Sequence, residues 1–260
     1  MRKSSLPFWA PGPFRADQLR SGDPYELSNG HPVHCFPTGR RGGKATSVGD
    51  GVLASDPAVQ DVGVDVGFSP SPEILRAPDL SVGDIPDQPG WAEGAPPLAV
   101  EYADTGQDEA DLQVKIQELF AAGTRHVWVV RLTGPRRVEV HQPGEKPQIA
   151  RAGEELRAPG ILANPVPVEA LYDRAAAREV ILRNLLQRQG YASLDEVRAE
   201  GELQGLRTAV VEVLIGRGLA VGEDLRLVLA ECGDAALLGS VLRQAAIATT
   251  TAEILAAFRA

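Results

Sequence analysis

The sequence predicts an α+β fold, in which a mixed β-sheet flanked by helices is followed by an all-helical C-terminal appendage. Two observations carry this prediction. Between residues 97 and 132 a strand pattern, a helix pattern and a second strand pattern follow one another, as in sheets that carry helices on their faces. Residues 168–260 contain no proline and show helical patterns. We therefore expect an extended N-terminal arm over 1–24, a sheet-containing domain over 25–167 and a helical region over 168–260.

Bulk composition restricts the class of protein. With 43% hydrophobic residues, the 260-residue chain can bury a substantial core. Its apolar runs fall well short of the ~20 residues that a bilayer requires, and Pro7 and Pro11 interrupt any signal-peptide core. Cys35 and Cys232 lie far apart and form no metal-binding motif, which suits a reducing compartment. We expect a cytoplasmic protein without a membrane partner.

The net charge of −9 argues against a protein that binds nucleic acid by overall electrostatic attraction, because phosphate contacts require lysine and arginine. A local basic rim remains compatible with this charge. Two groups could form such a rim, namely Arg40, Arg41 and Lys44, and the pair Arg136 and Arg137. For each group alone, a solvated turn is the simpler interpretation.

The elements before residue 97 are short. Residues 1–24 are rich in proline and glycine and lack periodicity. Asn29-Gly30 separates two strand patterns within 25–36, which predicts a hairpin. A glycine-rich turn is expected over 38–43 and a weak helix over 45–54. Strand patterns follow over 62–68 and 74–82, and the four prolines within 83–97 indicate a loop.

The stretch 97–103 is a core strand with one conspicuous residue. Alternation places Glu101 on the face of Ala99 and Ala103, opposite the larger apolar residues. A glutamate among small side chains leaves space for a metal and a substrate.

A helix is expected over 108–122, ending at Gly123. Lys115 occupies an apolar position in its stripe of Leu112, Ile116, Leu119 and Phe120. Strands over 126–132 and 137–141 complete the sheet. The tail is expected to form helices over 168–189, 194–217, 223–231, 235–245 and 252–258.

Three charged residues stand where a folded protein would normally avoid a charge: Asp79, Glu101 and Lys115. Two carboxylates suffice to hold Mg2+ or Mn2+, and the backbone carbonyl of Tyr102 could complete the protein ligands. Such a cation lowers the pKa of its bound water. Lys115 would orient that water or stabilise developing negative charge. Glu26 and Asp104 are further candidates for the site, although structural roles are simpler for both.

These residues belong to a longer series of motifs in a fixed order. Lys115 stands eight residues before Gly123 (123−115). The series consists of Tyr25-Glu26-Leu27 with Asn29-Gly30, Arg76-Ala-Pro-Asp79, Leu98-Ala-Val-Glu101, Lys115 with Ala122-Gly123, and His126-Val-Trp-Val-Val130. In this order and spacing, residues 20–165 resemble the PD-(D/E)XK nuclease superfamily, and more closely its Uma family of restriction endonucleases.

The resemblance implies a restriction-endonuclease-like fold for 25–167 and a Mg2+-dependent endonuclease acting on DNA. It assigns catalysis to Asp79, Glu101 and Lys115. Some family positions differ. The tyrosine four residues after the lysine is Leu119, the serine three residues after the glutamate is Asp104, and the histidine of the first helix is missing. These differences concern the handling of substrate, and they leave the acid, acid and lysine set intact.

Other interpretations stay open at this point. Asp79 could be a turn residue, Glu101 could pair with Arg131, and Lys115 could extend to solvent. The chain would then be a catalytically weak or inactive binding or assembly protein that acts through its helical tail, which is also the candidate surface for a homodimer. Convergence of the two carboxylates and the ammonium group would favour the enzyme.

Overall fold

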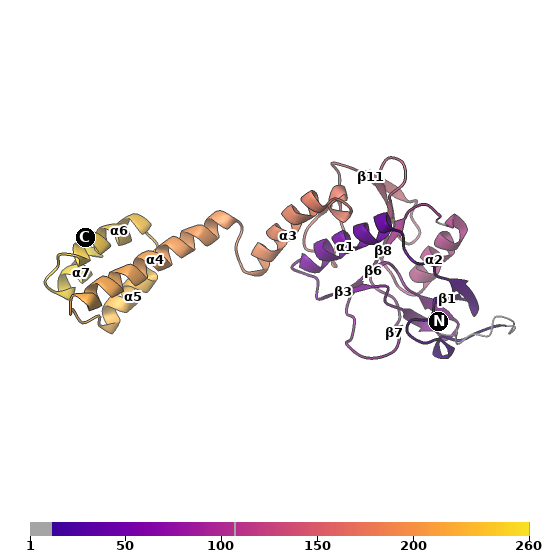
Figure 1. The fold of residues 1–260 in the computed structure, drawn as a ribbon, viewed down its shortest axis with the longest axis horizontal. Coiled ribbons are helices and arrows are strands. Elements are labelled where there is room, and N and C mark those ends of the chain that lie inside the picture. Colours follow the sequence, from indigo (N-terminus) through magenta and orange to yellow (C-terminus); the bar gives the residue numbers. More distant parts are fainter. Residues whose placement is uncertain (1–11, 107, 260) are drawn as a thin grey trace. The chain divides into compact units, whose positions relative to one another are not determined.

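The computed structural model describes residues 12–106 and 108–259, and the chain divides into two compact units, 1–189 and 190–260 (Figure 1). The first unit extends beyond the boundary expected at residue 167. The reason is that η2 (Val168–Leu171) and α3 (Arg174–Arg188) pack against α1 (Arg40–Ser55). The guanidinium of Arg188 donates to the carbonyls of Ser55, at 2.9 Å, and Val59, at 2.6 Å, so α3 is held on the first unit.

The first unit is built on a six-stranded mixed sheet. Its strands lie in the order β11 (Gln148–Arg151), β10 (Arg137–His141), β9 (His126–Arg131), β8 (Leu98–Ala103), β6 (Leu80–Gly83) and β3 (Asp61–Val64). Strands β8 and β9 are parallel and are joined through α2 (Glu109–Ala121), whereas the other pairs are antiparallel. The start of β6 and the ends of β3, β8 and β9 therefore lie together where these strands begin or end. This end of the sheet is called the site edge below.

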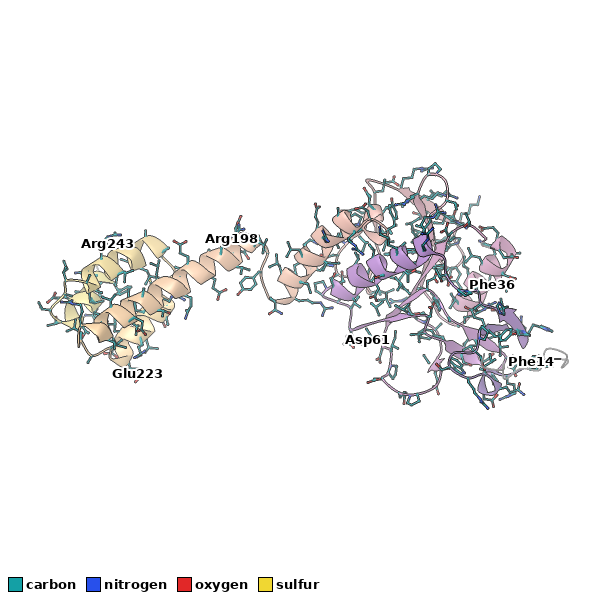
Figure 2. All side chains as sticks on the ribbon, in the orientation of Figure 1. Phe14, Phe36, Asp61, Arg198, Glu223 and Arg243 are labelled. Carbon is teal, nitrogen blue, oxygen red and sulfur yellow. The ribbon has the colours of Figure 1, made fainter. Side chains whose placement is uncertain are left out.

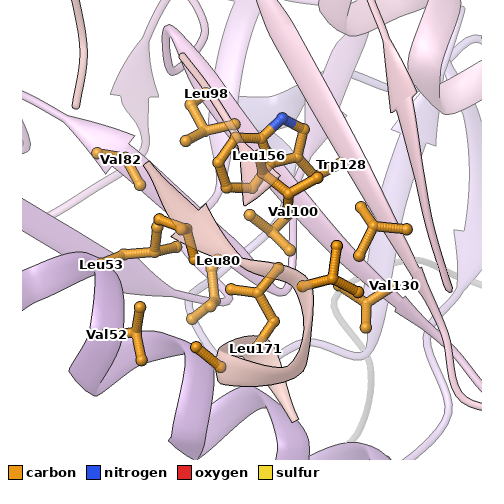
Figure 3. Close-up of a cluster of buried hydrophobic side chains, with 14 of the residues drawn as sticks. Val52, Leu53, Leu80, Val82, Leu98, Val100, Trp128, Val130, Leu156 and Leu171 are labelled. Atoms are coloured by element: carbon orange, nitrogen blue, oxygen red, sulfur yellow. The ribbon is translucent and has the colours of Figure 1, made fainter. Parts of the chain in front are cut away.

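Helices cover both faces of this sheet. Alternate residues of β6, β8 and β9 pack against α1 on one face, as Figure 3 shows for Val52, Leu53, Leu80, Val82, Leu98, Val100, Trp128 and Val130. The opposite face packs small and β-branched residues against α2, through Ala99, Ala103, Val127, Val129, Leu112, Ile116 and Leu119. Each large apolar side chain buried in this way contributes roughly 1.5–3 kcal/mol. The mixed sheet flanked by helices confirms the fold expected from the sequence.

A second, smaller sheet lies in the same unit. Its order is β2 (His31–His34), β1 (Tyr25–Ser28), β5 (Ile74–Arg76), β4 (Phe68–Ser71) and β7 (Ala92–Glu93). The hairpin between β1 and β2 turns at Asn29 and Gly30, whose φ values of 47° and 74° are those that a tight two-residue turn requires. A further pair, β12 (Glu155–Leu156) and β13 (Val166–Pro167), is antiparallel.

Two segments differ from the expected local structure. Helix α1 begins at Arg40, within the predicted turn 38–43, because burial of Ala45, Val48 and Val52 outweighs the low helix propensity of its glycines. Residues 12–24 of the expected arm are packed. Phe14 and Leu19 belong to a cluster of buried apolar residues, and η1 (Ala16–Gln18) forms one turn between them. Residues 1–11 lie outside the described part of the chain.

The second unit is helical, as expected. It consists of α4 (Leu194–Gly216), α5 (Glu223–Glu231), α6 (Ala235–Ala245) and α7 (Thr251–Ala257). Its own core includes Val210, Leu214, Leu229, Val241 and Ile254. Within residues 12–106 and 108–259, no helix has both the length and the apolar character needed to cross a bilayer.

Candidate active site

Two carboxylates predicted from the sequence are brought together at the site edge. Asp79 immediately precedes β6, and Glu101 lies in β8, its antiparallel neighbour, where Leu80 pairs with Val100. The Oδ2 atom of Asp79 accepts a hydrogen bond of 2.6 Å from the backbone N–H of Tyr102. Asp79 is thereby fixed to the strand that carries Glu101.

Lys115 reaches the same place from α2. Its Nζ atom lies 2.8 Å from Glu101 Oε1 and 2.9 Å from Glu26 Oε1, and it donates to the carbonyl of Ala77 at 2.8 Å. These three partners match the three hydrogens of an ammonium group. The side chain is only 12% exposed, so the interpretation in which Lys115 extends to solvent is wrong.

Arg131 does not take Glu101 as a partner. Its guanidinium instead pairs with Glu109, at 2.5 Å, and with Glu139, at 2.9 Å. The cation next to Glu101 is therefore Lys115, and the three residues named by the sequence form one charged cluster.

A line of alternating charges supports Lys115 from behind. Arg76, on β5, places Nη1 2.9 Å from Glu26 Oε2 and Nε 2.5 Å from Glu118 Oε2. Glu118 also accepts a hydrogen bond of 2.6 Å from the hydroxyl of Ser28. With its side chain only 3% exposed, Arg76 joins the small sheet to α2. Loss of Lys115 would leave Glu101 without a cation, and loss of Arg76 would do the same to Glu118; a buried charge left in this way strongly destabilises a protein.

The carboxyl groups around Lys115 are in different electrostatic states. Burial raises the pKa of Glu101 to about 8; Lys115 opposes this shift, and Asp79 and Glu26 add to it. Burial also raises the pKa of Asp79. Burial alone would raise the pKa of Glu26 as well, but Lys115 and Arg76 together hold it below its ordinary value. Glu26 has two cations and stays ionised, whereas Glu101 shares one cation and holds a proton below about pH 8.

Glu101 and Glu26 in turn keep Lys115 charged. Burial by itself would lower the pKa of its ammonium group, but these two carboxyl groups, the hydrogen bond to Glu101 and the field of Asp79 raise it.

The structure adds site residues that the sequence analysis missed. Asp65 follows β3, and its N–H points to the carbonyl of Asp79 at 3.4 Å. Partial loss of water raises the pKa of Asp65, although the residue as a whole is exposed, and Lys115 lowers this pKa while Glu26 raises it. Asp65 therefore faces the same cluster. Arg76 and Glu118 were also missed. The sequence feature that could have identified Arg76 is its position inside the apolar stretch 74–82.

Asp104 is engaged elsewhere. Its carboxylate pairs with Arg41 and accepts a 2.7 Å hydrogen bond from the N–H of Thr105. This is the loop-capping role that the sequence allowed for it. Ligation by the Tyr102 carbonyl stays a prediction.

The donor set fits a hard divalent cation. Within the described residues no group of three His, Cys, Asp or Glu side chains is arranged to hold a metal ion. Mg2+ needs only one or two carboxylates together with water. Asp79 and Glu101 supply these oxygens, and Glu101 Oε1 is buried 2.8 Å from the ammonium group of Lys115.

Comparison with known proteins points to nucleases. The model of the Uma2 family, described as "Putative restriction endonuclease", matches residues 15–166, a range that contains Glu26, Asp79, Glu101 and Lys115. A crystal structure from Anabaena variabilis, described as a putative nuclease belonging to DUF820, has a TM-score of 0.50 and 14% identity. That similarity covers 64% of this chain and 99% of the other, and it supports the fold. No curated protein matches the chain.

Proposed function

Because the chain belongs to the Uma2 family of restriction-endonuclease-like proteins, we propose that it is a metal-dependent endonuclease that hydrolyses phosphodiester bonds in DNA. The observation that supports this proposal is the convergence of Asp79, Glu101 and Lys115 at one edge of the sheet. Family membership gives the nuclease class. The dependence on a metal ion and the choice of DNA as the substrate go beyond family membership and are proposed here.

Asp79 and Glu101 would hold Mg2+ or Mn2+, with the backbone carbonyl of Tyr102 as a third protein ligand. Such a cation, when bound, neutralises phosphate charge and lowers the pKa of a coordinated water. The hydrogen bond from the Tyr102 N–H fixes one Asp79 oxygen and leaves the other available for ligation.

Lys115 would act on the reacting phosphate. In the structure its three hydrogens are taken up by Glu101, Glu26 and Ala77. If Glu101 becomes a metal ligand, Glu26 and Ala77 still hold the ammonium group, and one donor becomes free to face the attacking water or a phosphate oxygen. A fixed positive donor at that position stabilises charge that develops during hydrolysis.

The test is cleavage of supercoiled plasmid and of single-stranded DNA with Mg2+, with Mn2+ and with EDTA. Asp79→Asn and Lys115→Met should each lose activity by about 10²-fold or more, by analogy with the removal of one charge-stabilising group. Asp84→Asn is a matched control, because Asp84 is exposed and follows the opposite end of β6. It should cleave like the wild type.

Three results would contradict the proposal. Cleavage that persists in EDTA would exclude the metal, and cleavage by Asp79→Asn at the wild-type rate would exclude the site. Cleavage of RNA alone would exclude the DNA substrate. A wild-type protein that binds DNA but cleaves nothing under these conditions would support the non-catalytic alternative.

A further inference from the structure

The site edge carries a group of cations that the proposed chemistry does not use. Arg40, Arg41 and Lys44 are exposed in the first turns of α1, and Arg136 is exposed in the turn between β9 and β10. These four residues are called the basic patch below. They include members of both groups in which the sequence allowed a basic rim.

The sheet brings the two parts of the patch together. Arg41 pairs with Asp104, the first residue after β8. The end of β8 lies beside the end of β9, where the N–H of Leu132 donates to the carbonyl of Ala103 at 2.9 Å. The turn that carries Arg136 begins just beyond Leu132. Arg41, through its ion pair with Asp104, and Arg136 thus lie beside neighbouring strand ends.

Arg136 is held in place by an aromatic ring. Its guanidinium carbon lies 4.8 Å from the ring centroid of Tyr172, which is a cation–π contact. The next residue, Asp173, caps α3. Its pKa is lowered mainly by the N–H groups of Ala176 and Ala175, and further by Arg136 and Lys44, so both cations lie near this cap.

The patch has a surplus of positive charge. Its four cations face Asp104 and Asp173, and Glu169 also lies near Tyr172, which leaves a local balance of about +1 (4−3) in a chain of net charge −9. The two aspartates also accept hydrogen bonds from backbone N–H groups, at 2.7 Å from Thr105 and at 2.8 Å from Ala175. Those bonds satisfy part of the acids' capacity. An external anion would compete with Asp104 for Arg41, whereas Arg40 and Lys44 are exposed to solvent.

We propose that the basic patch binds the phosphodiester backbone of duplex DNA on one side of the bond that the site cleaves. This inference rests on the proposed function. Along β8, Asp104 lies three residues beyond Glu101, roughly 10 Å at the usual rise of a strand. That span equals about three base-pair steps measured along the axis of duplex DNA. A strand with its scissile phosphate at Glu101 therefore brings neighbouring phosphates to the patch.

Binding of a labelled duplex by the full chain in EDTA tests the proposal without cleavage. The patch variant is Arg40→Gln, Arg41→Gln, Lys44→Gln and Arg136→Gln combined. The control combines Arg157→Gln, Arg198→Gln, Arg226→Gln and Arg243→Gln, four exposed arginines that are not members of the patch, of which Arg198 and Arg243 are labelled in Figure 2. Both variants change the net charge from −9 to −13 (−9−4), so overall charge is matched.

The patch variant should bind at least about tenfold more weakly. The magnitude of its slope of log affinity against log salt should fall by up to about 3.6, since each of the four phosphate contacts contributes about 0.9. The control should stay within about twofold. Tyr172→Leu, which keeps every charge and removes the ring under Arg136, should weaken binding about two- to threefold. Equal melting temperatures would show that the variants are folded.

Several outcomes would overturn the proposal: no binding by the wild type, equal weakening in the patch variant and the control, or a patch-dependent preference for RNA or single strands. The result also separates the two proposals. Patch-dependent binding without cleavage would support DNA binding by the patch and refute the proposed nuclease activity. Metal-dependent cleavage with patch-independent binding would do the reverse.

Discussion

Two buried carboxyl groups share the ammonium group of Lys115, and this sharing determines what a substitution of the lysine does. Lys115→Met keeps the length of the side chain and removes the charge, which leaves Glu26 and Glu101 without that cation. We expect the free energy of unfolding to fall by about 3 kcal/mol at pH 8, as for other broken buried pairs. Urea titration measures it. Lys44→Met, at an exposed lysine, should change stability by less than about 0.5 kcal/mol. Equal effects in both variants would contradict this account.

Glu101 makes stability depend on pH in an unusual direction. Its pKa rises from 4.5 to about 8 on folding, so between these values the folded protein holds a proton that the unfolded chain has released. The stabilisation from this group is complete below pH 4.5 and is lost as the pH rises through 8. The loss has an upper limit of about 1.4 kcal/mol per pH unit.

Metal-free wild type and Glu101→Gln can be compared by urea titration at pH 5, 6.5 and 8. The variant lacks the titrating group, so its stability relative to the wild type should improve steadily toward pH 8. Parallel stability curves for the two proteins would show that Glu101 does not titrate in this range.

At the scale of elements, α1 approaches β8 closely at Gly49. A Cβ atom added there would lie 1.9 Å from the phenol oxygen of Tyr102, which itself donates to the carbonyl of Leu171 at 3.0 Å. Gly49→Ala gains up to about 1 kcal/mol of helix propensity, but it forces a packed ring to move, which typically costs 1–3 kcal/mol. We expect a net loss of stability and, because the Tyr102 N–H holds Asp79, weaker cleavage.

Gly205→Ala in α4 is the matched control, because nothing lies within 4 Å of the added Cβ atom. It should be stabilising by up to about 1 kcal/mol. Thermal melts of the two variants decide the matter, and stabilisation of both would refute the close contact at Gly49.

The same elements show how far the sequence could be interpreted. Local patterns predicted β8, α2 and β9, and a charge in an apolar position identified Glu101 and Lys115. Glu26 was a candidate for the site, but its pairing with Lys115 could not be predicted, because the two residues are 89 positions apart and Glu26 belongs to the other sheet. Arg76 resembled an ordinary strand residue until both of its carboxylates were visible. The first turn of α1 was missed because packing of its later residues stabilises it.

At the scale of the whole molecule, the chain should behave as two independently folding parts with their boundary at residue 189. Residues 1–189 keep Ala177 and Val180 of α3 in the main core, and they keep the bonds from Arg188 to the end of α1. We expect fragment 1–189 to unfold cooperatively in a thermal melt, and fragment 1–167 to be much less stable because it exposes the apolar residues under α3. Residues 190–260 have a separate core and should fold alone. A fully stable 1–167 fragment would contradict this division.

Association of the chain is a separate question. Apolar side chains such as Leu182, Leu185, Ile215 and Leu227 stay exposed on helices of the C-terminal region. We predict a homodimer whose contacts involve this region, and light scattering at micromolar concentration tests it. The full chain should have the mass of a dimer. Replacing Ile215 and Leu227 with glutamine, or Leu182 and Leu185 in a second variant, should identify which pair contributes. A monomeric full chain would refute the prediction.

The charged cluster also has a consequence for folding kinetics. The contacts that assemble it join residues far apart in the chain: Glu26 to Lys115 spans 89 positions, Glu26 to Arg76 spans 50, and Arg76 to Glu118 spans 42. Closure of such long loops is slow because it costs conformational entropy. Contacts within the cluster offset this cost only after strands and helices nearer in sequence have paired. The cluster should therefore form after the rate-limiting step. Substitutions there would leave the rate of folding nearly unchanged and would shorten the lifetime of the folded protein.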